Sequence, residues 1–224
     1  MSELLPCVRI DPATAATASV IWLHGLGADG HDFEPIVPML RTTGVRFVFP
    51  HAPTLAVTIN GGHVMPAWYD IRSLDFDAVS REDPDQIRTS AGRIEALVAD
   101  ERKRGIPSDR IVLCGFSQGA AMAVHVGVRH VEPLAGIIAL SGYLLEPGEL
   151  AAERHAANLG VAVFGGHGTR DEMVPVAAGR ACHAALRSTA AQGADHTWHE
   201  YPMGHEVCPP ELEHVGAWLR ARLG

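Results

Sequence analysis

One serine, placed where a buried strand would turn directly into a buried helix, constrains this chain most. It lies in the run Gly115-Phe116-Ser117-Gln118-Gly119. Apolar residues 111–114 before the run predict a strand, and the Ala- and Val-rich residues 118–129 predict a helix. A strained strand-to-helix turn needs glycine on both sides, because side chains at 115 and 119 would collide with neighbouring elements. This context predicts that Ser117 is a nucleophile; an ordinary glycine-rich turn with an incidental serine is the alternative.

Short apolar runs and helical segments alternate along the rest of the chain, which is typical of βαβ units around a mainly parallel sheet. The predicted strands are residues 19–23, 45–49, 111–114, 135–140, 161–164 and 197–201. The last of these alternates polar and apolar residues, which favours a position near a sheet edge. The predicted helices are residues 85–104, 118–129, 176–187 and 210–223. Together with the serine turn, this order predicts an α/β-hydrolase fold, a mainly parallel central sheet flanked by helices.

The 224 residues, of which 47% are hydrophobic, suit one compact domain, and no repeat or linker interrupts them. We therefore expect a single domain over residues 1–224. Residues 54–81 fit neither the helical nor the strand period, and we interpret them as a long functional loop with short pieces of structure.

Charge and composition exclude several kinds of partner. A net charge of −8 without any Lys/Arg-rich run makes nucleic acid an unfavourable partner. No apolar stretch reaches the roughly 18 residues of a transmembrane helix, so we expect no stable membrane insertion. The N-terminus lacks the basic start and apolar region of a signal peptide. The widely spaced cysteines (Cys7, Cys114, Cys182, Cys208) favour reduced thiols and a cytoplasmic location.

A second glycine-rich loop follows the first predicted strand, in the run His24-Gly25-Leu26-Gly27-Ala28-Asp29-Gly30. In α/β-hydrolases this loop carries one of two backbone donors that stabilise the oxyanion. We expect the donors to be the N–H groups of Leu26 and Gln118, and His24 to order the loop. Phosphate binding is the competing interpretation, but the loop lacks the Gly-Lys-Ser/Thr ending of a P-loop.

A serine nucleophile needs a base, and 13 histidines compete for that role. In this fold the chain order is Ser, then Asp or Glu, then His, with the base after a late strand. His205 satisfies this order. Asp171 leaves the strand 161–164 at the edge where α/β sites form, and it would orient the imidazole. Glu172 is the alternative acid, and His167 is expected to support the acid loop instead.

Two other classes of function compete with a serine hydrolase. A non-catalytic ligand-binding protein on the same fold would normally lack one member of the triad. A zinc hydrolase is suggested by the many histidines, but no zinc-ligand motif is present. His196 and His199 would point to opposite faces of a strand. We therefore expect no metal and no cofactor.

These motifs together resemble the phospholipase/carboxylesterase family, which includes acyl-protein thioesterases and small bacterial carboxylesterases. The resemblance runs from Ile21-Trp22-Leu23-His24-Gly25-Leu26-Gly27 to Tyr201-Pro202-Met203-Gly204-His205-Glu206. Between them stand Phe49-Pro50-His51-Ala52-Pro53, Met65-Pro66-Ala67-Trp68-Tyr69-Asp70-Ile71, the serine run and His167-Gly168-x-x-Asp171. One departure is Gly119-Ala120, where many relatives carry Gly-Gly.

The resemblance implies a cofactor-free hydrolase with Ser117, Asp171 and His205 as triad and Leu26 and Gln118 as oxyanion donors. The substrate would be a small-molecule ester or thioester. Hydrolysis of short to medium carboxylic esters is our first expectation; acyl-protein thioesterase and lysophospholipase activity are the alternatives. A homodimer is an assembly that the family allows, although no dimer surface can be identified from sequence.

The acyl pocket is expected to involve the loop around Trp68. Leu74, Phe76 and Val174 are further candidates for its lining. Structural packing of Trp68 in the core is the competing interpretation.

Overall fold

The computed structural model describes residues 4–76 and 81–224. Its strands are β1 (Cys7–Ile10), β2 (Ala18–Leu23), β3 (Val45–Pro50), β4 (Thr54–Val57), β5 (His63–Pro66), β6 (Ile111–Phe116), β7 (Gly136–Leu140), β8 (Val163–Gly168) and β9 (His196–Tyr201). Its α-helices are α1 (Val37–Leu40), α2 (Pro84–Lys103), α3 (Gln118–Arg129), α4 (Leu150–Glu153), α5 (Val176–Ser188) and α6 (Pro209–Leu223). Single-turn 3-10 helices lie at Glu34–Ile36, Thr58–Asn60, Ser108–Arg110 and Ala156–Asn158.

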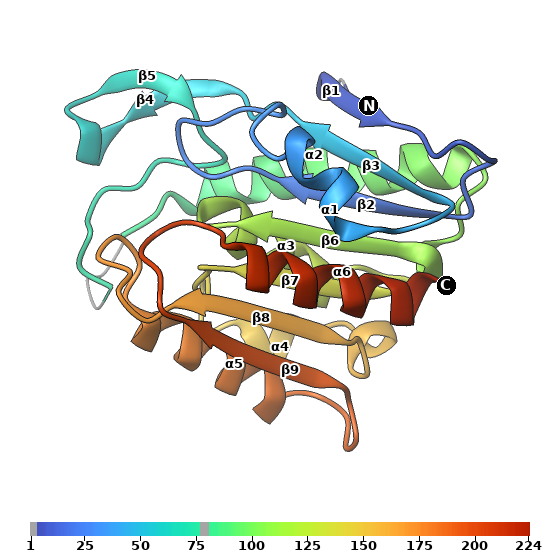
Figure 1. Cartoon of the computed structure of the whole chain (residues 1–224). Coiled ribbons are helices and arrows are strands. Elements are labelled where there is room, and N and C mark those ends of the chain that lie inside the picture. Colours follow the sequence, from blue (N-terminus) through green and yellow to red (C-terminus); the bar gives the residue numbers. More distant parts are fainter. Residues whose placement is uncertain (1–3, 77–80) are drawn as a thin grey trace.

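Seven of the strands in the described residues form one sheet in the order β1-β3-β2-β6-β7-β8-β9. All neighbouring pairs are parallel except β1–β3, which is antiparallel (Figure 1). The predicted α/β fold is therefore confirmed. Strand β9 is the last of the sheet, as its alternating pattern predicted. Because the remaining strands run in one direction, their carboxyl ends meet at one edge, where sites form in such sheets.

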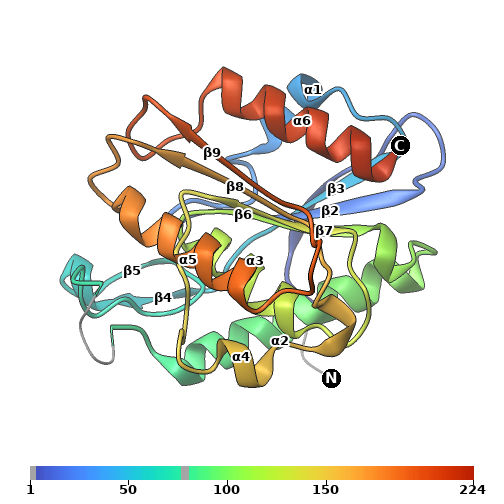
Figure 2. The ribbon, with the colours of Figure 1, turned by 90° about the horizontal axis from the view of Figure 1, so that it is seen from below.

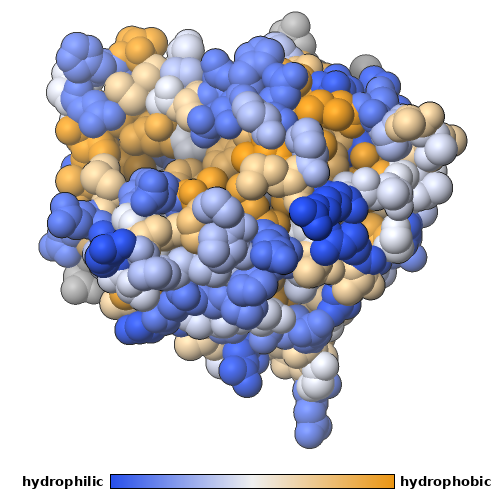
Figure 3. All heavy atoms as spheres, in the orientation of Figure 1, coloured by the Kyte–Doolittle hydropathy of each residue, from blue (hydrophilic) through white to orange (hydrophobic). Residues whose placement is uncertain are grey.

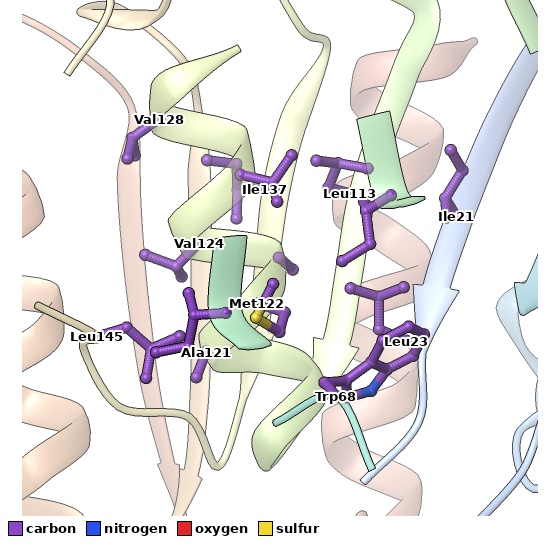
Figure 4. Packing of buried hydrophobic residues seen from close by; sticks show 14 of the residues in the cluster. Ile21, Leu23, Trp68, Leu113, Ala121, Met122, Val124, Val128, Ile137 and Leu145 are labelled. Atoms are coloured by element: carbon purple, nitrogen blue, oxygen red, sulfur yellow. The ribbon is translucent and has the colours of Figure 1, made fainter. Parts of the chain in front are cut away.

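Helices cover both faces of this sheet. Helices α2, α3 and α5 contribute to one apolar cluster, whereas α6 contributes to a second cluster across the sheet. Figure 2 shows α6 and α1 on one side and α2 to α5 on the other. In Figure 4, Met122 lies on the side of α3 that faces Leu23, whereas Val124 lies on the other side of the helix, towards Leu145; all of them belong to one apolar cluster. The serine turn is thus anchored by buried elements before and after it.

Two differences from the sequence prediction have physical causes. Strand β1 was not predicted, because its four half-buried residues, interrupted by Arg9, are too short a run to show a strand pattern. Strand β8 spans Val163–Gly168, whereas the sequence predicted a strand at residues 161–164, because a run of glycines carries no apolar pattern. A Cβ at Gly165 would lie 2.5 Å from the ring of Trp198, so glycine there serves close packing within the strand.

Residues 54–76, within the segment 54–81 that was interpreted as a loop, contain more regular structure than predicted, and residues 77–80 lie outside the described residues. Strands β4 and β5 form a separate antiparallel hairpin, which extends away from the main sheet (Figure 1). Gly61 and Gly62 between them have φ of 66° and 78°, a conformation that glycine adopts without strain.

The cysteines are all free, and no helix in residues 4–76 or 81–224 is both long and apolar enough to cross a bilayer.

Glu211, in the first turn of α6, is a fully buried carboxyl group. It packs against Gly166 of β8, and neither carboxyl oxygen has a hydrogen-bond partner among the described residues. Burial raises the pKa of Glu211 from its usual 4.5 to about 8. Between these values the folded protein holds a proton that the unfolded chain has lost. The stabilisation by the neutral form is therefore complete below pH 4.5 and is lost as the pH rises to about 8.

We therefore expect Glu211→Gln to be increasingly more stable than the wild type as the pH rises. The gap should grow by about 1.4 kcal/mol per pH unit within this window, because glutamine cannot ionise. Urea denaturation of both proteins at several pH values measures the gap. The two proteins must be compared, because the pKa values of the buried His125 and the half-buried His196 are lowered and add the same opposite slope to both stability curves. Parallel curves would contradict the prediction.

Candidate active site

Ser117 occupies the turn between β6 and α3 in a conformation that is strained for a non-glycine residue. Its φ is 55° and its ψ is −120°. A Cβ at Gly115 would overlap the backbone of Gly119 and lie 2.5 Å from the nitrogen of Ala120. A Cβ at Gly119 would overlap Leu23 and lie 2.5 Å from the carbonyl oxygen of His24. Only glycine therefore fits on either side of the serine, because Gly115 lies against the start of α3 and Gly119 lies against the end of β2.

His205 and Asp171 lie beside this serine, although both are far from it in sequence. The Nε2 atom of His205 is 2.9 Å from the Oγ atom of Ser117, and its Nδ1 atom is 2.7 Å from the Oδ2 atom of Asp171. The structure thus brings the three residues of the predicted triad into one hydrogen-bonded chain. The ring of His205 also packs against Phe116, with 4.8 Å between ring centroids.

The carboxylate of Asp171 is held by its own loop. Its Oδ1 atom accepts hydrogen bonds from the amides of Met173 at 2.9 Å and Val174 at 2.8 Å. Burial alone would raise the pKa of Asp171, but the hydrogen bonds from His205 and these amides outweigh it and keep the pKa below its usual value. The Nε2 atom of His167 lies 2.8 Å from the carbonyl oxygen of Val174, so His167 holds the loop that carries Asp171 by a hydrogen bond to its backbone.

The glycine-rich loop after β2 lies against the serine turn. A Cβ at Gly25 would contact Phe116 and Ser117 at 3.3 and 3.5 Å. The amide of Leu26 donates no hydrogen bond to any described residue. Gln118 is the first residue of α3, so its amide has no acceptor within the helix. His24 is buried between its own loop and Ala52, whose amide donates to the Nε2 atom of His24 at 3.0 Å.

A cavity of about 290 Å³ opens beside Ser117 and His205. Most of its wall is apolar, and Figure 3 shows hydrophobic side chains gathered around a hollow on the side of the β4–β5 hairpin. The lining residues are Gly25, Leu26, Ala28, Asp32, Ile59, Asn60, Ile71, Leu74, Arg81, Phe116, Ser117, Gln118, Tyr143, Met173, Val174 and His205. Leu74 and Met173 are each 57% exposed and lie at the rim.

The four residues suggested for the pocket from sequence have different positions. Leu74 and Val174 line the cavity. Phe76 lies behind the wall, where its ring packs edge-on against Tyr143 and under the guanidinium of Arg81. The pocket position expected for Trp68 is corrected: its side chain is fully buried, and in Figure 4 it lies beside Leu23 in the core. Its backbone amide and its indole nitrogen both donate hydrogen bonds to other parts of the site.

Several lining residues were missed by the sequence analysis. Tyr143 follows β7 at the carboxyl edge of the sheet, so the general rule for α/β sites could have found it. Met173 and Phe116 are direct neighbours of residues that were predicted. Ile59 comes from the 3-10 turn between β4 and β5, and no local pattern indicated its position.

The histidines of β9 form two separate pairs with histidines of neighbouring helices, away from this site. His196 packs against His183 of α5, whereas His199 packs against His214 of α6 on the other face of the sheet. In residues 4–76 and 81–224, no three His, Cys, Asp or Glu side chains are grouped so that they could hold a metal ion.

The parallel sheet, the strained serine turn and its histidine neighbour define an α/β-hydrolase-fold protein of the hydrolase class. The model of the phospholipase/carboxylesterase family matches residues 7–223, and the chain therefore belongs to this family, as its motifs predicted.

Relatives of known name agree with this assignment. The acyl-protein thioesterase 1 of Cryptococcus neoformans var. neoformans serotype D is 35% identical over 237 residues, with all of both chains covered. The crystal structure of acyl-protein thioesterase 2 from Zea mays has a TM-score of 0.87 at 25% identity and covers 98% of this chain and 99% of its own. The crystal structure of the esterase PE8 has a TM-score of 0.84 at 29% identity, and the match covers 99% of this chain and 100% of the esterase.

Proposed function

We propose that this chain hydrolyses acyl thioesters and esters through an acyl-enzyme formed on Ser117, with S-acylated proteins as the preferred substrate class. The observation that carries the proposal is the hydrogen-bonded chain from Ser117 to His205 to Asp171, with separations of 2.9 and 2.7 Å. These are hydrogen-bond distances, as proton transfer between a nucleophile and its base requires.

The reaction follows from these positions. The Oγ atom of Ser117 attacks the substrate carbonyl while the Nε2 atom of His205 takes its proton. The tetrahedral intermediate then collapses, the C–S or C–O bond breaks, and His205 returns the proton to the leaving thiol or alcohol. Water, deprotonated by the same histidine, attacks the acyl-enzyme, and the acid leaves as Ser117 recovers its proton. Asp171 remains ionised and stabilises the imidazolium, consistent with its lowered pKa.

The oxyanion of each tetrahedral intermediate would be stabilised by the amides of Leu26 and Gln118. Both come from the loop and helix end that adjoin Ser117, and neither donates elsewhere in the described residues. The amino end of α3 adds a favourable dipole, because Gln118 is its first residue.

Two observations support an acyl thioester substrate over the short esters that the sequence favoured. The relative from Cryptococcus neoformans, matched over its whole length, is named an acyl-protein thioesterase. The cavity beside Ser117 is mostly apolar and, at about 290 Å³, close to the lower end of small-molecule sites. It can enclose an acyl chain of medium length, while a longer chain would pass the exposed rim residues Leu74 and Met173. A cytoplasmic location belongs to the same proposal.

A direct comparison of substrates tests the class. We expect kcat/KM for an S-octanoyl- or S-palmitoyl-cysteine peptide to exceed that for p-nitrophenyl butyrate by at least about tenfold. Turnover of the butyrate without turnover of either peptide would favour a short-chain carboxylesterase instead. A preference for lysophosphatidylcholine over both would favour lysophospholipase activity. Failure to hydrolyse any ester or thioester, together with no labelling of Ser117 by a fluorophosphonate, would reject hydrolysis altogether.

The acid is tested separately. We expect Asp171→Asn to lower kcat by about 10⁴, because an amide cannot hold the imidazole in the required tautomer or stabilise its positive charge. Circular dichroism and urea denaturation show whether the variant is folded. Glu172→Gln is the matched control, because Glu172 is exposed and the hydrogen bond to His205 comes from Asp171. A larger loss in Glu172→Gln than in Asp171→Asn would reverse the assignment.

A further inference from the structure

The side chain of Gln118 holds a segment of backbone that no step of the proposed reaction uses. Gln118 is 1% exposed. Its Oε1 atom accepts from the amide of Trp68 at 2.8 Å, and its Nε2 atom donates to the carbonyl oxygen of Tyr69 at 2.8 Å. The oxygen and the nitrogen of this one side-chain amide therefore bond to the backbones of two consecutive residues. We call residues 66–69 the support segment.

The support segment is bonded in turn to the glycine-rich loop that carries Leu26. The indole Nε1 atom of Trp68 donates to the carbonyl oxygen of His24 at 2.9 Å. The amide of Gly27 donates to the carbonyl oxygen of Pro66 at 2.8 Å. These two bonds hold the loop on both sides of Leu26, two residues before it and one residue after it.

From these contacts we infer that the Gln118 side chain is a positioning residue that aligns the two oxyanion donors with each other. Its own backbone amide is one donor, and its side chain fixes the support segment that places the amide of Leu26. The inference rests on the proposed function, because it concerns the oxyanion of that reaction. It also explains why Trp68 is buried away from the cavity: its indole and its backbone connect Gln118 to His24.

Physical considerations favour an effect on the transition state more than on substrate binding. Backbone donors stabilise an oxyanion only when their positions are fixed before charge develops, and one such donor contributes about 10²–10³ to the rate. A loop with a freed Leu26 amide would still line the cavity and bind the acyl chain. Loss of the Gln118 side chain should therefore lower kcat and leave KM nearly unchanged.

The test is Gln118→Met, which keeps the length of the side chain and removes both hydrogen bonds. Rates are divided by the concentration of active sites, titrated with a fluorophosphonate and counted by intact mass. We expect kcat to fall by about 10- to 100-fold with KM within about threefold. The inhibition constant of a trifluoromethyl ketone, which forms an oxyanion on Ser117, should rise by the same factor as kcat falls.

Asn158→Leu is the matched control. Asn158 is another fully buried amide that bonds only to backbone, accepting from Leu134 at 3.0 Å and donating to His130 and Glu132 at 2.8 Å. None of these residues lines the cavity. We expect this variant to lose stability as Gln118→Met does, but to keep kcat per active site within about twofold. An equal loss of kcat in both variants would assign Gln118 a merely structural role and overturn the inference.

Trp68→Phe provides a second measurement if Gln118→Met does not fold. It removes the indole donor to His24 and keeps an aromatic ring. We expect a kcat loss of about tenfold with little change in KM, and a double variant whose loss is smaller than the product of the two single losses, because both act through one segment. Unchanged kcat in Trp68→Phe would overturn the inference. A wild-type protein without any ester or thioester turnover would instead reject the proposed function.

Discussion

Ser117→Ala is expected to lower kcat for an acyl thioester by roughly a factor of 10⁶. The hydroxyl of Ser117 is within hydrogen-bond distance of the Nε2 atom of His205, and alanine leaves the histidine without a nucleophile to activate. Substrate binding should persist, because the cavity wall is formed mostly by other side chains. The rate is measured with S-octanoyl-cysteine peptide at saturating concentration, and binding is measured separately by calorimetry.

Ser141→Ala is the control for this substitution. Ser141 follows β7 at the same sheet edge, has φ of 48° like a strained turn residue, and is fully buried. Its hydroxyl has no partner among the described residues. We expect Ser141→Ala to keep kcat within a few-fold. Substantial turnover in Ser117→Ala at the same site would mean that another group attacks the substrate.

Gly119→Ala is expected to destabilise the protein by about 3 kcal/mol and to abolish most activity together with the fold of the serine turn. The added methyl group would overlap the carbonyl oxygen of Leu23 and lie 2.5 Å from that of His24. Both are backbone atoms of β2 and the loop after it, so they cannot rotate away as a side chain could. Urea denaturation measures the loss, and fluorophosphonate labelling reports the state of Ser117.

Gly92→Ala is the control for this substitution, because Gly92 also lies in a helix but has room for a side chain. Gly92 lies within α2, and a Cβ there would meet no atom within 4 Å. Alanine should therefore stabilise the helix by about 0.5–1 kcal/mol, because glycine has the larger conformational entropy when unfolded. If Gly119→Ala were as well tolerated as Gly92→Ala, the close approach of the serine turn to β2 would be wrong.

The sequence was informative where local pattern and global fold agree. Helix α3 begins at Gln118 and ends at Arg129, the limits that its small apolar residues predicted. The order Ser117, Asp171, His205 predicted three residues that meet at one edge of the sheet, because parallel strands bring their carboxyl ends together. The hydrogen-bond distances between them are new information from the structure, and their catalytic roles remain a proposal.

The position of Trp68 could not be read from sequence, because an aromatic residue in an irregular loop can pack inward or line a pocket. What decides it is a set of hydrogen bonds to residues distant in the chain, His24 and Gln118. The same limit applies to β8, which continues beyond the predicted residues 161–164 because its glycines allow close contact with Trp198 and Glu211. Such contacts depend on tertiary structure, and no local pattern predicts them.

The central claim is that hydrolysis passes through an acyl group on Ser117. The measurement that tests it most directly is mass spectrometry of the protein quenched in acid during turnover of S-octanoyl-cysteine peptide, followed by digestion and peptide mapping. We predict one octanoyl group on the peptide that contains Ser117 in the wild type, and none in Ser117→Ala. An octanoyl group on another residue during turnover would contradict the account. So would turnover that continues in Ser117→Ala with no acyl group on the protein, because water would then attack the substrate directly.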